Sequence, residues 1–146
     1  MRLARRDRLH QAVVLDPDEA RRLFASIAEF ATPVMIRIEC ADRLTRTFND
    51  IEEFLAYEND RPSEIRAISF ESHRTSGRWA TVEIENTRVG DNIAISLEGD
   101  GVDVEKTSKA IDAQIASMKP AYAVFTEWAA YLFPLLIVIG IWAAGS

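Results

Sequence analysis

Apolar positions recur with the helical period in three stretches of the chain. The first begins at Asp16, an N-cap residue followed by Pro17, and its apolar stripe includes Leu23 and Ile27. The second follows Asn49, which we expect to act as its N-cap, and the third precedes the apolar C-terminal segment. The pattern therefore predicts three amphipathic helices.

A period of two, typical of half-buried strands, recurs in other stretches. These stretches are residues 34–40, 43–48, 64–72, 78–85 and 92–98. The resulting order α-β-β-α-β-β-β-α predicts an α+β fold, in which an antiparallel sheet of about five strands is packed on one face by helices. A C-terminal transmembrane helix is expected to follow this domain.

Some individual side chains have expected places in these strands. Cys40 continues an apolar strand face, so we expect it to be a small buried filler. Leu44 and Phe48 are expected to share one side of the second strand.

The charges divide the chain into three parts. Residues 1–15 form a basic arm with four arginines and one aspartate, expected either to be a solvated terminus or to bind an anionic membrane surface. Residues 16–120 form the α+β domain, and residues 121–146 form the transmembrane segment. No secretory signal is recognisable at the N-terminus, so we expect the domain to lie in the cytosol.

The last part of the chain carries the strongest signal. Residues 128–146 contain no ionisable side chain, and as a helix they would extend about 28 Å, close to the ~30 Å hydrocarbon core of a bilayer. Trp128 and Tyr131 at one end and Trp142 at the other are expected to be interfacial anchors. The sequence therefore predicts a single membrane-spanning helix.

Two residues within this predicted span are candidates for helix packing, Pro134 and Gly140. Lys109 and Lys119 precede the span and no basic residue follows it, which favours a cytosolic N-terminal domain. The span is expected to be either a tail anchor or the first arm of a helical hairpin.

Composition excludes several function classes. The net charge of -6 argues against nucleic acid as a partner. One cysteine and two distant histidines argue against a disulfide framework and a metal site. The sequence motifs of nucleotide-binding loops, serine hydrolases and zinc proteases are missing. We therefore expect no catalytic residue, no cofactor and no metal ligand.

The predicted outer face of the sheet offers a candidate surface for a protein partner. It carries Met35 and Arg37 from one strand and Trp79, Glu83 and Glu85 from another. An exposed tryptophan and methionine amid charges are typical of an interaction hot spot, unless another part of the chain covers them. Opposite charges on neighbouring strands are expected to form cross-strand ion pairs.

Three functional hypotheses follow. The leading one is a membrane-anchored, non-enzymatic domain that recruits, senses or assembles at the cytoplasmic face, with membrane lipid and a protein partner or further copies of itself as its partners. The alternative is a membrane-perturbing effector whose soluble domain senses a signal and clusters its transmembrane helices. The least favoured is an enzyme that uses the acidic face around Glu83 and Glu85.

Overall fold

The structure of the chain, a computed structural model, describes residues 1–13, 15–59, 65–72, 77–87 and 90–118. Within these ranges it forms an α+β domain with a six-stranded antiparallel sheet. The elements in chain order are β1 (Arg2–Leu9), α1 (Pro17–Phe30), β2 (Val34–Cys40), β3 (Thr45–Phe48), α2 (Ile51–Asn59), β4 (Ile65–Ser72), β5 (Trp79–Glu85), β6 (Ile93–Asp100) and α3 (Gly101–Ser117).

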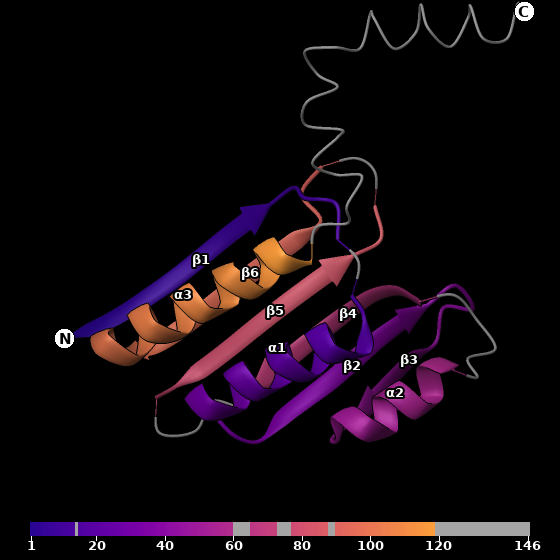
Figure 1. Cartoon of the computed structure of the whole chain (residues 1–146), viewed down its shortest axis with the longest axis horizontal. Coiled ribbons are helices and arrows are strands. Elements are labelled where there is room, and N and C mark those ends of the chain that lie inside the picture. The colour runs from indigo at the N-terminus through magenta and orange to yellow at the C-terminus, as the bar shows by residue number, and fades with distance from the viewer. Residues whose placement is uncertain (14, 60–64, 73–76, 88–89, 119–146) are drawn as a thin grey trace, which may run out of the picture.

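The strands are arranged in the order β1-β6-β5-β4-β2-β3, so the first strand of the chain lies at one edge and the short β3 at the other. Figure 1 shows α1 and α3 side by side in front of the sheet, with α2 beside β3 at the far edge. Helix α3 contacts β6 and β1, whereas α1 contacts β4, β5 and β2. All three helices therefore lie on one side of the sheet, which we call the covered face. The opposite side, over which the structure places no helix among the described residues, is the open face.

The hydrophobic core lies between the covered face and the two longer helices. Each central strand sends alternate side chains into it, among them Ile36, Phe70 and Val82, and α1 and α3 contribute Leu23 and Ile111; all five are fully buried. A close contact supports this packing, because a Cβ atom on Gly99 of β6 would lie 3.0 Å from the ring of Phe30.

The structure tests the two predicted helix caps, of which one is right and one is wrong. The Asp16 side chain accepts a hydrogen bond from the Glu19 backbone N–H at 2.8 Å, which confirms the predicted cap of α1. The cap of α2 was predicted one residue too early. Asp50, and not Asn49, accepts from the backbone N–H of Glu52, because its carboxylate lies nearer the free N–H groups of the first turn.

The prediction of an α+β fold with an antiparallel sheet and three helices is confirmed, but the sheet has one strand more than expected. Residues 2–9, expected to be a basic arm, form β1 and pair with β6 over eight positions. Another difference concerns Leu44, which is 57% exposed and precedes β3, so it does not share a buried side with Phe48. Cys40 is buried, as predicted.

No helix among the described residues is both long and apolar enough to cross a membrane. The predicted span in residues 121–146 lies outside the described residues, together with its expected packing and anchor positions.

Candidate protein-binding surface

The structure brings the five predicted surface residues to the open face. On β2, Met35 and Arg37 alternate with side chains that are buried in the core. On β5, Trp79, Glu83 and Glu85 alternate in the same way with buried apolar residues. Because side chains alternate strictly along a strand, all five lie on the side that the helices leave uncovered.

The predicted tryptophan–methionine pair does not form. Met35 stands opposite Glu71 of β4, and Trp79 stands opposite Glu98 of β6. Strand β4 lies between β2 and β5, so the two apolar side chains belong to separate parts of the open face. The sequence gives no register between strands that are distant along the chain, which is why this detail was wrong.

Trp79 instead belongs to a polar cluster near β1. Its indole Nε1 donates a hydrogen bond to the Glu98 carboxylate at 2.7 Å, and the Arg2 guanidinium donates to the other oxygen of that carboxylate at 3.2 Å. Glu98 of β6 therefore bonds to a side chain of β1 on one side and to a side chain of β5 on the other. The indole remains half-buried, with its ring on the open face.

Cross-strand ion pairs were expected here, and the structure contains them. Arg37 of β2 lies 3.4 Å from the Glu71 carboxylate of β4, and Arg2 of β1 pairs with Glu98 of β6. Both pairs are partly exposed to solvent, so each contributes less than about 1 kcal/mol to folding. They keep the open face polar and fix the side chains that surround its shallow hollows.

The pKa of the Glu83 carboxyl on this face is raised above its ordinary value. Partial burial raises its pKa, and the nearby negative charges of Glu85 and Glu71 raise it further, whereas Arg8 opposes the shift. A carboxylate that is crowded by like charges gains most from a cationic group brought to it by a partner.

Small side chains hollow the open face at its centre. Ala67 and Ser69 of β4 form the floor of a shallow depression of about 350 Å³, and its rim includes Arg37, Glu71 and Glu83. Sequence reasoning missed this depression because it depends on four neighbouring strands, on which short side chains lie between long ones. Alternation of an alanine and a serine with buried residues in 64–72 was the only signal available.

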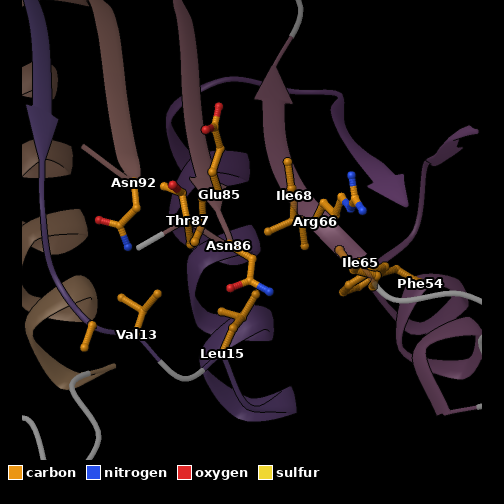
Figure 2. Close-up of a pocket in the computed structure, with 13 residues that line it drawn as sticks. Val13, Leu15, Phe54, Ile65, Arg66, Ile68, Glu85, Asn86, Thr87 and Asn92 are labelled. Atoms are coloured by element: carbon orange, nitrogen blue, oxygen red, sulfur yellow. The ribbon is translucent and has the colours of Figure 1, made fainter. Parts of the chain in front are cut away.

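A second concavity, of about 470 Å³, lies at the end of the sheet where β5 finishes and β4 starts. Figure 2 shows Asn86 close to Leu15, with Val13 and Asn92 on one side and Phe54 on the other. Among the described lining residues the ionisable ones are Arg66 and Glu85. Segments that are far apart along the chain build this pocket: the residues before α1, helix α2, the start of β4, and the end of β5 with the residues that follow it. No sequence pattern predicted it.

Within the described ranges, no group of three or more His, Cys, Asp or Glu side chains is placed to hold a metal ion. No family model, curated protein or solved structure matches the chain. Function is therefore inferred from the surfaces of the molecule themselves.

Proposed function

We propose that this chain is a membrane-anchored binding domain, without catalytic activity, that recruits or assembles protein at the cytoplasmic face of a membrane. The observation that carries the proposal is the open face of the sheet. It carries an indole, a thioether and several charged groups at different places on a surface that no described helix covers. Protein interfaces favour this combination of aromatic, methionine and charged residues.

The anchor rests on the sequence. Residues 128–146 are free of charge and flanked by tryptophans, and the basic residues before them favour a cytosolic domain. Helix α3 ends at Ser117, so only about ten residues separate the folded domain from this segment. Such a short connection would keep the domain close to the lipid surface.

Flotation of the full chain with liposomes tests the anchor. The wild-type chain is expected to float, and the double variant Leu136→Arg, Ile139→Arg is expected to stay in the soluble fraction. Each arginine near the centre of a spanning helix costs about 2.5–3.5 kcal/mol. The matched variant Leu136→Ala, Ile139→Ala should still float. Flotation of the arginine variant would contradict a spanning helix.

Light scattering of the detergent-solubilised full chain tests the open face. We expect a mass above that of one copy if the partner is a further copy, and a lower mass for Trp79→Ala and for Glu83→Arg. Val102→Ala is the control, because Val102 is 75% exposed on α3, on the opposite side of the domain. A single-copy mass for the wild-type chain would direct the search to a different protein.

Two results would contradict the proposal as a whole. Turnover of a small substrate that is lost in Glu83→Gln, Glu85→Gln would favour an enzyme on the acidic face. Leakage of dye from liposomes that carry the full chain, suppressed by substitutions at Pro134 or Gly140, would favour the membrane-perturbing effector.

A further inference from the structure

Strand β1 leaves one long edge of the sheet unpaired, since its only partner among the described strands is β6. The Met1 carbonyl accepts from the Gly101 N–H at 2.8 Å, and the Leu9 carbonyl accepts from the Asn92 N–H at 3.0 Å. Backbone groups of successive residues point to opposite sides of a strand. The odd-numbered residues of β1 therefore bond to the sheet, and the even-numbered residues direct their N–H and C=O groups outward.

The two edges of the sheet differ in how they are protected. At the far edge, β3 has four residues, and short edge strands resist further pairing. At the near edge, β1 has eight residues in unbroken register with β6. One outward donor is occupied, because the Arg8 N–H donates to the Asp7 carboxylate at 2.9 Å. Within the described residues, the outward N–H groups of Ala4 and Arg6 have no acceptor.

The side chains along this edge are cationic. Arg6 and Arg8 are exposed on the open face, and within the part of the chain described here no carboxylate forms an ion pair with either. Arg5, on the covered face, is different, because it is bonded to Asp112 at 2.8 Å and to Asp7 at 3.2 Å. Arg8 also lies close enough to Glu83 to lower the pKa of that carboxyl, so Arg6 is the less compensated of the two. The free N–H groups of Ala4 and Arg6 and the guanidinium groups of Arg6 and Arg8 therefore lie along the same edge.

A second copy of β1 fits this edge poorly. In a symmetric antiparallel pair, outward-directed residues of one copy stand opposite outward-directed residues of the other, and these residues are Arg2, Ala4, Arg6 and Arg8. The register that pairs all of them places Arg2 opposite Arg8 twice. Like charges directly opposite each other destabilise a strand pair. A strand that carries carboxylates on alternate residues would meet the arginines with the opposite charge.

We infer that the free edge of β1 is a docking site for an extended, acidic segment of a partner protein, which adds to the sheet as a seventh strand. Backbone hydrogen bonds to Ala4 and Arg6 hold the segment, and its carboxylates pair with the guanidinium groups of Arg6 and Arg8. This site lies at the β1 edge, next to the open-face surface proposed above, and it does not require the membrane anchor.

The test uses the full chain in nanodiscs of zwitterionic phosphatidylcholine and an end-blocked eight-residue peptide of alternating valine and glutamate. We expect binding, at least tenfold weaker for the same peptide with glutamine in place of glutamate. The double variant Arg6→Gln, Arg8→Gln should also bind at least tenfold more weakly, and Arg66→Gln, which alters an exposed arginine on β4, should bind normally.

Two measurements separate strand addition from simple charge attraction. Ala4→Pro removes an outward N–H without breaking a bond to β6 or changing the charge, so it should abolish binding, whereas Ala4→Val should retain it. In the wild-type chain, saturating peptide should slow amide hydrogen exchange at least tenfold at Ala4 and Arg6 and leave Leu3 and Arg5 unchanged. This exchange measurement decides the question if Ala4→Pro fails to fold.

Three outcomes would overturn the inference. One is the absence of binding to the folded wild-type chain at millimolar peptide. Another is binding without new protection at Ala4 and Arg6, which would mean attraction to the arginines alone. The last is self-association of the chain without peptide, accompanied by the same protection of these amides, which would assign the edge to a second copy.

Discussion

The covered and open faces belong to the same strands but are built from different side chains. On β4, Ile68 and Phe70 enter the core, whereas Ser69 and Glu71 between them lie on the open face. The covered face gains its stability from apolar burial, at roughly 25 cal/mol per Å². The open face is polar and partly exposed, so substitutions on it are expected to change stability less. The difference indicates which substitutions should affect folding and which should affect binding.

The largest expected effect comes from a substitution that creates a cavity in the core beneath the helices. Phe70 is fully buried and faces Ile36 and Val82 across the neighbouring strands. Phe70→Ala should lower the free energy of unfolding by about 3–5 kcal/mol. Thr81→Ala, on the open face of β5, should change it by less than about 0.5 kcal/mol. Denaturant unfolding of the full chain measures both, and similar losses would abolish the distinction between the faces.

Two adjacent arginines of β1 provide the next comparison. Arg5 lies on the covered face, where it donates to Ser108 and to the Asp112 carboxylate of α3, whereas Arg6 lies exposed on the open face. Arg5→Ala should cost about 1–2 kcal/mol, because hydrogen bonds to charged groups are lost. Arg6→Ala should cost less than about 0.5 kcal/mol. Denaturant unfolding measures both losses, and a larger loss for Arg6→Ala than for Arg5→Ala would contradict this assignment.

Trp79 tests whether an open-face residue serves association more than it serves stability. Its ring is half-buried, and its indole N–H donates to the Glu98 carboxylate on the open face. Trp79→Ala should therefore reduce the free energy of unfolding by about 1 kcal/mol or less while it weakens association. Unfolding followed by near-ultraviolet circular dichroism measures the loss of stability, and light scattering measures the loss of association. A loss of several kcal/mol would make Trp79 a core residue.

The smallest effect concerns pH. Burial and the charges of Glu85 and Glu71 raise the pKa of Glu83 in the folded state, so the folded state holds this proton more tightly than the unfolded state. Its contribution to stability is therefore lost as the pH rises from about 4 towards neutrality. Glu83→Gln should raise stability at pH 7 by less than about 0.5 kcal/mol, since the group is only partly buried and solvent screens its charge. Unfolding curves of the wild-type chain and of Glu83→Gln, recorded at pH 4 and at pH 7, should differ less at pH 4.

The sequence predicted the fold class well because the covered face imposes a regular period on its strands and helices. Strand β1 escaped prediction for a physical reason. Its side chains that face α3 include Arg5 and Asp7. Arg5 forms ion pairs with both Asp7 and Asp112. The apolar alternation that marks a strand is therefore missing, and a charged sequence with few apolar residues is typical of a solvated terminus.

The side of the sheet on which the five candidate residues lie was predicted from the sequence, but their arrangement on it was not. Strict alternation places Met35, Arg37, Trp79, Glu83 and Glu85 on one side of their strands, whatever the sheet order. Which of them are neighbours depends on strand order and register, and here β4 separates the methionine from the tryptophan. Long-range pairing is decided by the whole core, and no short stretch of sequence encodes it.

The pairing of β1 with β6 also bears on when the domain is complete. Residues 2–9, at the start of the chain, pair with residues 93–100, so the chain must close a long loop to form this ladder. During synthesis the N-terminal residues emerge first and have no partner until β6 has left the ribosome. Once β6 has paired with β5, it forms the edge of the sheet until β1 pairs with it. The arginine edge of β1 therefore exists only on a finished domain, and a protein that binds it distinguishes folded from nascent chains.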